Sequence, residues 1–249
     1  MQMETTNQLK KDFKLTLSRL SHEIRNPITL INSELQLMAA SHPELCSYRQ
    51  WDSLMDNLDY VKELLNELSD FSHAQTVNLV SVDPAEFLNT ILSCQKNTLD
   101  YLGISLETHI ENISSTILLD RVKMRQVIFN LIRNSCESIN HPKGKITVNL
   151  YKTDSGICIS IKDNGCGMTQ TQMQNIFCPF VTYKPEGTGL GLALAEQIIS
   201  SHKGYLYAES EKGKGSTFHI YLPILDMDHT PQIAQNVSGK EYHIVVADD

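Results

Sequence analysis

Two long segments near the start of the chain carry apolar residues at helical spacing. In the first, apolar positions recur at 13, 17, 20, 24, 28, 31, 35 and 38, and a short polar stretch follows. In the second, the steps alternate between three and four residues, which is a heptad pattern. This second stripe comprises Trp51, Leu54, Leu58, Val61, Leu65, Leu68 and Phe71. The pattern predicts a helical hairpin whose stripe is too long for one partner helix, so we expect two hairpins to form a four-helix bundle in a homodimer.

After a linker-like stretch at 74–80, helical segments mix with segments of alternating polarity. Asp83 and Pro84 form a typical helix start, as N-cap and first-turn residue. Thr169 and Gln172 have the spacing of a capping box for a short helix. Further helices are expected at 120–140 and 191–202, and strands at 104–110, 145–153, 157–163, 205–210 and 216–223. This part of the chain therefore predicts an α+β fold, an antiparallel-rich sheet with its helices on one face.

Length and charge limit the classes of protein to consider. The 249 residues suffice for two small domains, and we expect a dimerisation hairpin at 1–76, a second domain at 77–225 and a linker at 226–249. Twenty-one Lys and Arg against 29 Asp and Glu give a net charge of −8, which argues against a nucleic-acid-binding surface. No apolar run approaches the roughly 20 residues that span a bilayer, so we expect no membrane segment and a cytoplasmic location.

The six cysteines are widely scattered, with no C-x-x-C pair and no zinc-like spacing with histidine. The spacing therefore gives no indication of a zinc site. We expect free, mostly buried thiols in a reducing compartment.

The motif S-H-E-I-R-N-P interrupts the first predicted helix with unusual chemistry. His22 is expected on the solvent side, opposite the apolar stripe. Glu23 can hydrogen-bond one imidazole nitrogen and raise the nucleophilicity of the other, and Asn26, one turn on, can orient a water molecule. Pro27 removes a helical hydrogen bond and should bend the helix. A kinked bundle helix with chance polar residues fits the stretch as well, so this motif alone leaves both interpretations open.

Two polar features of the second domain suggest a ligand. Asn130 and Asn134 are four residues apart on one predicted helix, and their amide oxygens are suitable ligands for Mg²⁺ bound to phosphates. Asp163 ends a strand, where its carboxylate can accept a hydrogen bond from an exocyclic amine such as that of adenine. Gly165 and Gly167 would let the backbone pass close to a flat ring.

A glycine-rich segment runs directly into the helix expected at 191–202. It ends in Gly187, Gly189 and Gly191. Unpaired backbone N–H groups at a helix N-terminus favour an anion, and Lys184 with Thr182 or Thr188 would add a charge and a hydroxyl. The P-loop, the Rossmann motif and the protein-kinase motifs are all missing from the sequence, so the phosphates must be held in another way.

These motifs together resemble the catalytic core of sensor histidine kinases of two-component systems, over residues 10–225. S-H-E-I-R-N-P resembles the phosphoacceptor box, N-L-I-R-N-S the N box, D-N-G-C-G-M the first glycine box, and F-C-P-F with G-T-G-L-G-L-A the F box and second glycine box. Five ordered motifs are far more specific than one. The short segment before the glycines and the acidic Glu137 are similar to the sporulation and nitrogen-regulation kinases.

The resemblance implies a fold and a reaction. The helical hairpin would be followed by the Bergerat-type α/β sandwich that binds ATP. His22 would be autophosphorylated and would pass the phosphoryl group to an aspartate of a response-regulator receiver domain, with Glu23 as acid/base partner and Asn26 orienting water for a phosphatase activity. Asn130 and Asn134 would bind Mg²⁺ on ATP, and Asp163 the adenine amine. The other residues that the resemblance places at the nucleotide are Gly165, Gly167, Phe180, Lys184, Gly187, Thr188, Gly189, Leu190 and Gly191.

Two other classes remain as alternatives, an ATPase or chaperone-like module of the same fold and a non-catalytic dimeric scaffold. The first predicts no phosphoacceptor histidine, and the second predicts decayed ATP motifs. Residues 242–249, Y-H-I-V-V-A-D-D, are similar to the first strand and acidic pair of a receiver domain. We expect either a truncated hybrid kinase, which the similarity favours, or a strand that resembles a receiver by coincidence. The stimulus, the cognate regulator and the choice between cis and trans phosphorylation do not follow from the sequence.

Overall fold

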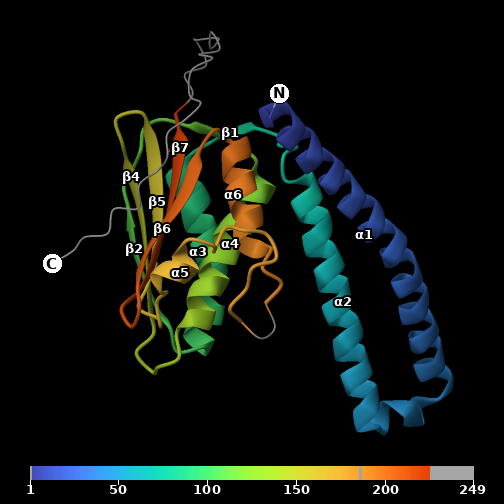
Figure 1. The fold of residues 1–249 in the computed structure, drawn as a ribbon. Helices are drawn as coiled ribbons and strands as arrows, with labels where there is room; N and C mark the ends of the chain where they lie inside the picture. Colours follow the sequence, from blue (N-terminus) through green and yellow to red (C-terminus); the bar gives the residue numbers. More distant parts are fainter. Residues whose placement is uncertain (1, 185–186, 225–249) are drawn as a thin grey trace.

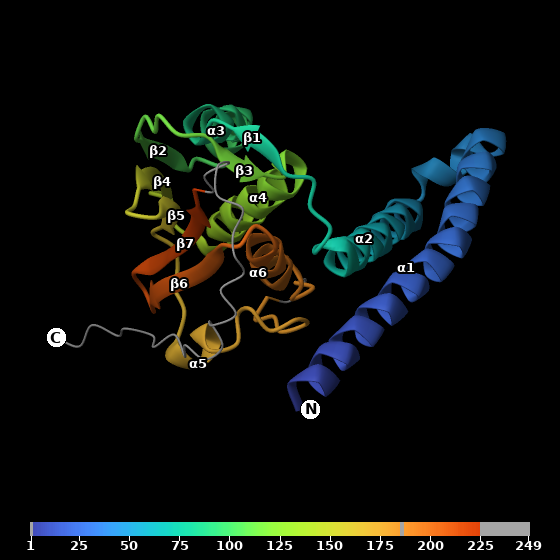
Figure 2. The ribbon, with the colours of Figure 1, turned by 90° about the horizontal axis from the view of Figure 1, so that it is seen from above.

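The computed structural model describes residues 2–184 and 187–224, and it begins with the predicted helical hairpin (Figure 1). Helix α1 (Gln2–Ser41) and helix α2 (Arg49–His73) are joined by a short 3₁₀ helix, η1 (Pro43–Ser47). Helix α1 is continuous through Pro27. In Figures 1 and 2, α2 rather than α1 lies beside the helices of the second domain, and contacts join α2 to α6.

Much of the apolar stripe of α1 is not covered by its own hairpin partner. The side of α1 that meets α2 includes Ser21, which is fully buried, and Arg25, whose Nη2 donates to the carbonyl of Leu65 at 3.3 Å. Four members of the stripe expected to form the bundle seam are 44–49% exposed within this single chain, namely Leu20, Ile24, Ile31 and Met38. Leu17, Ile28 and Leu35 of the same stripe are half-buried. One hairpin therefore leaves much of this stripe uncovered, as its length predicted.

A five-stranded sheet forms the second domain, in the order β2-β4-β5-β7-β6. Its strands are β2 (Ser105–Ile110), β4 (Lys145–Lys152), β5 (Gly156–Asp163), β6 (Tyr205–Glu211) and β7 (Gly215–Pro223). Strand β2 is parallel to β4, and the other neighbours are antiparallel, so the expected antiparallel-rich sheet is confirmed. Ile146 pairs with Asp163, which places this aspartate at the end of a central strand.

The sequence pattern did not reveal a second, smaller sheet. Strands β1 (Val80–Val82) and β3 (Ile117–Leu119) pair antiparallel, with Val80 opposite Leu119. The stretch interpreted as a linker therefore runs directly into a strand at Val80. Three-residue strands are too short for alternation to identify them.

Helices cover one face of the large sheet, as predicted. They are α3 (Pro84–Tyr101), α4 (Arg121–Ser138) and α6 (Gly191–Ser201), and the short helix α5 (Gln170–Met173) lies at the sheet's end (Figures 1 and 2). Alternate residues of the central strands, such as Ile146 and Val148, are fully buried beneath these helices. The opposite face carries half-exposed aromatic side chains such as Tyr205 and Tyr207.

The helix starts confirm the capping predictions. The Asp83 carboxylate accepts hydrogen bonds from the backbone N–H groups of Ala85 and Glu86, with Pro84 in the first turn. Thr169 and Gln172 form a complete capping box. Asp120 caps α4 in the same way as Asp83 caps α3, and so fixes where the helix of the predicted magnesium ligands begins.

The expectation that the thiols are mostly buried was wrong. All six cysteines lie in the described residues and are free, but Cys46, Cys94, Cys166 and Cys178 are exposed, and only Cys158 is fully buried. Among the described helices, none combines the length and apolarity required to cross a membrane. The receiver-like stretch at 242–249 lies outside the described residues.

Candidate functional site

The polar turn of α1 lies on the surface of the hairpin. His22, Glu23 and Asn26 are all exposed, whereas their neighbour Ser21 is buried and donates its hydroxyl to the Leu17 carbonyl at 2.8 Å. Burial of Ser21 against α2 sets the rotation of α1. The imidazole is therefore accessible to another domain or another chain, as its place in the sequence predicted.

Asp163 holds a buried carboxylate whose two oxygens have different surroundings. The residue is 2% exposed. Its Oδ1 accepts hydrogen bonds from the backbone N–H of Gly165 at 2.8 Å, the backbone N–H of Ser216 at 3.2 Å and the hydroxyl of Ser138 at 3.1 Å. Its Oδ2 has one long contact, 3.4 Å from the hydroxyl of Ser135. The donors saturate Oδ1 and leave acceptor capacity on Oδ2, which fits an exocyclic amine.

The glycines after Asp163 pack against the protein itself. A Cβ at Gly165 would lie 2.0 Å from Oγ of Ser138, and a Cβ at Gly167 would lie 1.9 Å from the carbonyl oxygen of Glu211. Gly167 also has a φ of +59°. Sequence reasoning explained these glycines by the approach of a flat ring, but the contacts show that close packing of the loop already requires them.

Asn130 and Asn134 lie on α4 and reach two different parts of the glycine-rich segment. The Asn130 amide donates to the carbonyl of Gly191 at 3.4 Å. The Asn134 Oδ1 accepts from Nζ of Lys184 at 2.8 Å, and Glu137 forms an ion pair with the same ammonium. An amide oxygen and a carboxylate oxygen thus already converge on a cationic group. Oxygens of these two kinds are the ligands that Mg²⁺ prefers.

Other candidate ligand sets are missing from the described part of the chain, where no group of three or more His, Cys, Asp or Glu side chains is placed to hold a metal ion. The oxygens near the asparagine pair that could hold an ion are the amides of Asn130 and Asn134 and the Glu137 carboxylate, and a phosphate ligand would add its own.

The segment between Phe180 and α6 is tightly folded where it is described. Phe180 has a φ of +65° and its backbone N–H donates to the carbonyl of Gly189 at 3.0 Å. Gly189 has a φ of +69°, and a Cβ there would lie 2.6 Å from the Phe180 carbonyl carbon. Among the described residues, no side chain caps the start of α6, which follows Leu190. The first N–H groups of this helix therefore remain available to an anion.

Contacts between α2 and the second domain were not anticipated from the sequence. Glu67 accepts a hydrogen bond from Thr188 and lies 3.5 Å from Nη2 of Arg133. Asp70 accepts from Gln126 at 2.6 Å. Because these partners are distant in sequence, local patterns carry no signal for them, and they connect the hairpin to both α4 and the segment before α6.

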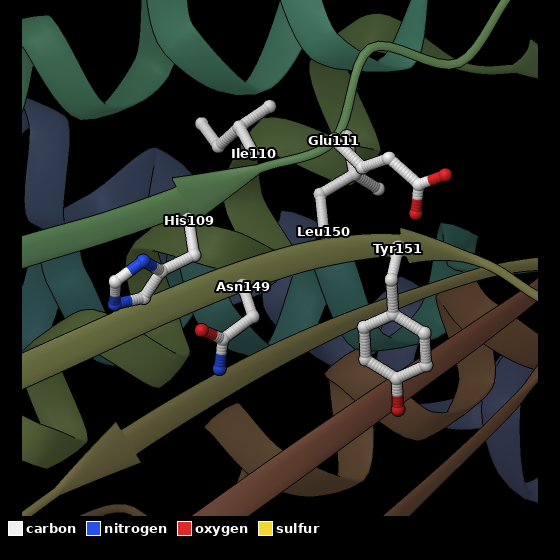
Figure 3. A pocket seen from close by; sticks show the side chains of 6 residues that line it. All are labelled: His109, Ile110, Glu111, Asn149, Leu150 and Tyr151. Atoms are coloured by element: carbon white, nitrogen blue, oxygen red, sulfur yellow. The ribbon is translucent and has the colours of Figure 1, made fainter.

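A surface pocket at the edge of the sheet is separate from all these residues. Figure 3 shows His109, Asn149 and Tyr151 projecting to one side of β2 and β4, with Glu111 beside them. A second pocket, between α3 and α4, includes Asn130 and Arg133 among its lining residues. The second pocket, unlike the first, thus touches the predicted ligand site.

Comparison with known families divides the chain into two matches. Residues 14–77 match the His Kinase A (phospho-acceptor) domain. Residues 119–226 match the family described as histidine kinase-, DNA gyrase B- and HSP90-like ATPases. Together the two matches cover more than half of the chain and include both the exposed histidine and the asparagine pair.

Similar curated proteins include sporulation kinases C and B of Bacillus subtilis (strain 168) and the signal transduction histidine-protein kinase AtoS of Escherichia coli (strain K12). Sporulation kinase C is 32% identical over 207 residues, which cover 82% of this chain and 47% of the relative. For sporulation kinase B the identity is 29%, covering 90% and 53%, and for AtoS it is 30%, covering 84% and 34%. The chain thus spans about half or less of the length of these relatives.

Solved structures show the same fold. Full-length ShkA in complex with AMPPNP has a TM-score of 0.71 at 23% identity, covering 84% of this chain and 45% of that one. The histidine kinase ThkA in complex with the response regulator protein TrrA has a TM-score of 0.63 at 22% identity, covering 89% and 66%. At these identities the similarity concerns the fold of both domains.

Proposed function

This chain belongs to the sensor histidine kinases, and on that premise we propose that it transfers the γ-phosphoryl group of ATP to His22 and then to an aspartate of a response regulator. Residues 1–76 would form the dimerisation and phosphotransfer domain, and residues 77–225 the ATP-binding domain. The observation that carries the proposal is the convergence of Asn130, Asn134 and the start of α6 on one side of α4, on the same domain as the partly unsatisfied carboxylate of Asp163.

The residues present suit ATP with Mg²⁺. When bound, ATP supplies the transferable phosphoryl group and Mg²⁺ neutralises phosphate charge. Oδ2 of Asp163 would accept from the adenine amine, and Asn130 and Asn134 would hold the metal ion through their amide oxygens. The N–H groups that begin α6 would bind phosphate oxygens. The remaining contacts would come from Gly165, Gly167, Phe180, Lys184, Gly187, Thr188, Gly189, Leu190 and Gly191.

On the hairpin, the chemistry would be carried by three side chains of one helical turn. An imidazole nitrogen of His22 would form the new P–N bond as the bond to the ADP leaving group breaks, and the Glu23 carboxylate would hold the proton on the other ring nitrogen. Phosphotransfer to a receiver aspartate would then restore the free imidazole. In a separate reaction, Asn26 would orient the water molecule that hydrolyses the aspartyl phosphate of the regulator and releases inorganic phosphate.

A homodimer is part of the proposal. The exposed stripe that includes Leu20, Ile24 and Ile31 is apolar and continuous along α1. A second copy of the hairpin would cover this stripe and form the four-helix bundle. Burial of such a stripe removes apolar surface from water, which is the main favourable contribution to association.

The direct test uses ATP labelled on the γ-phosphate, with Mg²⁺ and the purified chain. We expect label on the protein that is labile to acid and stable to alkali, and its loss in His22→Ala. His42→Ala, which removes an exposed histidine beside η1, is the matched control and should retain the label. ATP hydrolysis without labelling of the protein would favour the ATPase alternative. A chain that neither binds ATP nor becomes labelled would favour the non-catalytic scaffold.

A further inference from the structure

Two serines of α4 contact the carboxylate of Asp163 from the helical layer. Ser138 is the last residue of α4, and its hydroxyl lies 3.1 Å from Oδ1. Ser135, one turn earlier, is fully buried, and its hydroxyl lies 3.4 Å from Oδ2. The backbone donors to Oδ1, from Gly165 and Ser216, belong instead to the loop after β5 and to β7.

The Ser138 hydroxyl has one proton and two acceptors within reach. One is Oδ1 of Asp163, and the other is the Ser135 carbonyl at 2.9 Å. The ionised carboxylate is the stronger acceptor, because hydrogen bonds to a charged group are about twice as strong as neutral ones. The Ser138 carbonyl also accepts from the backbone N–H of Cys166 at 2.9 Å, which ties the end of α4 to the loop after Asp163.

These contacts fix the plane of the carboxylate from two sides. The backbone donors hold Oδ1 within the sheet layer, and Ser138 holds the same oxygen from the helix. A carboxylate with Oδ1 saturated has a single orientation, with Oδ2 as the oxygen that can take a further donor. Without Ser138, rotation about the side chain would exchange the environments of the two oxygens more readily.

We propose that Ser138, assisted by Ser135, is a positioning residue that presents Oδ2 of Asp163 to the base and thereby sets the preference for a purine with a 6-amino group. The proposal rests on the proposed function, because it concerns the same nucleotide site. An oriented acceptor rewards a donor on the base and penalises a 6-keto oxygen, which would face it as a second acceptor.

The test measures the affinity of the full chain for ATP and for purine riboside 5′-triphosphate, which lacks the 6-amino group. For Ser138→Ala we expect ATP affinity to fall about fivefold while the affinity for the analogue stays constant, so the ratio of the two affinities falls about fivefold. Ser135→Ala should reduce the ratio less, because its contact is longer. Ser93→Ala is the matched control, since Ser93 forms a similar hydroxyl-to-carbonyl bond within α3.

Each outcome decides between the two proposals. If wild type binds ATP in preference to the analogue and both serine variants keep that ratio, the positioning role is wrong. If Ser138→Ala lowers the affinity for both nucleotides equally, the role of Ser138 is structural and the inference fails. If thermal unfolding shows that Ser138→Ala does not fold, the ratio of ATP affinity to analogue affinity in Ser135→Ala alone decides whether the serines position Asp163. If wild type binds neither nucleotide, the proposed function itself fails.

Discussion

Thr188, in the segment before α6, donates a hydrogen bond to the carboxylate of Glu67 in α2, 121 positions earlier in the chain. Arg133 of α4 approaches the same carboxylate. One side chain of the hairpin thus holds two groups that, in the proposed site, lie next to the asparagine pair and the phosphate-binding glycines. In the proposed site Thr188 would also contact the nucleotide, so contact with the hairpin and contact with a nucleotide would compete for this side chain.

Replacement of Glu67 with alanine should favour nucleotide binding. The change removes both contacts, so Thr188 no longer has to be released from α2 before it contacts the nucleotide, and we expect ATP affinity to rise by about twofold to fivefold. Glu63→Ala, one turn earlier on the same helix, is the matched control. Calorimetric titration with ATP and Mg²⁺ measures the change, and an unchanged or weaker affinity in Glu67→Ala would show that this contact does not compete with the nucleotide.

Local patterns were sufficient for most elements of this fold. Asp83 and the Thr169–Gln172 pair predicted helix starts, and the alternation of apolar and polar residues predicted the long strands. Each of these signals depends on neighbours within a few residues. The contacts of Glu67 and Ser138 were missed, since they join segments that come together only through packing. The exposure of Cys166 and Cys178 was missed for the same reason, because burial depends on the tertiary surroundings rather than on residue type.

In the candidate site, too, the sequence predicted side chains but not the contacts between distant segments. Its side chains, including Asp163 and the pair Asn130 and Asn134, were predicted from the motifs alone. Their present partners were not found, such as the Lys184 ammonium beside Asn134. A motif identifies the chemistry of a side chain, whereas the partner that holds it depends on the path of the chain between them.

Asn134→Ala should separate metal binding from base binding. Removal of its amide oxygen takes away a ligand for Mg²⁺, so we expect ATP affinity in the presence of Mg²⁺ to fall about tenfold and affinity in a chelator to change little. Asn140→Ala, an exposed asparagine just beyond α4, is the control. An equal loss with and without Mg²⁺ would mean that Asn134 contacts the nucleotide directly rather than through the metal ion.

Charges placed on the exposed stripe of α1 should disrupt the dimer. In the double variant Leu20→Glu and Ile24→Glu, two carboxylates would be buried at the proposed seam, and we expect the dimer dissociation constant to rise more than about 100-fold. The pair Arg19→Glu and Gln36→Glu adds two carboxylates elsewhere on the same helix and should leave the dimer intact. Sedimentation equilibrium measures both. If the variant with both Leu20→Glu and Ile24→Glu stays dimeric, the dimer interface lies on another surface.

His202 should make the stability of the ATP-binding domain depend on pH. The ring is 3% exposed, its Nε2 accepts from the Asp120 backbone N–H at 2.8 Å, and its Nδ1 lies 2.7 Å from the Ile198 carbonyl. Since Nε2 accepts, the proton of the neutral ring is on Nδ1 and is donated to Ile198. Protonation of Nε2 would remove the acceptor that fixes the residue before α4.

Burial lowers the pKa of His202 below its ordinary value, so the folded protein favours the neutral ring. The unfolded chain takes up the proton near a pH of about 6.5, and stability is therefore complete above that pH and is lost as the pH falls towards the folded pKa. The free energy of unfolding should fall by up to about 1.4 kcal/mol per pH unit for one proton. His219, whose pKa is also lowered by burial, adds a loss of the same sign.

Denaturant unfolding at pH 7.5 and at lower pH values measures the slope of this dependence. His202→Gln keeps an acceptor and a donor but cannot be protonated in this range, so it should be less stable at pH 7.5 and show a shallower decline on acidification. The exposed His42→Gln should retain the wild-type slope. A slope in His202→Gln equal to that of wild type would assign the acid sensitivity to His219 or to the carboxylates, and the hydrogen bond at the start of α4 would then survive protonation.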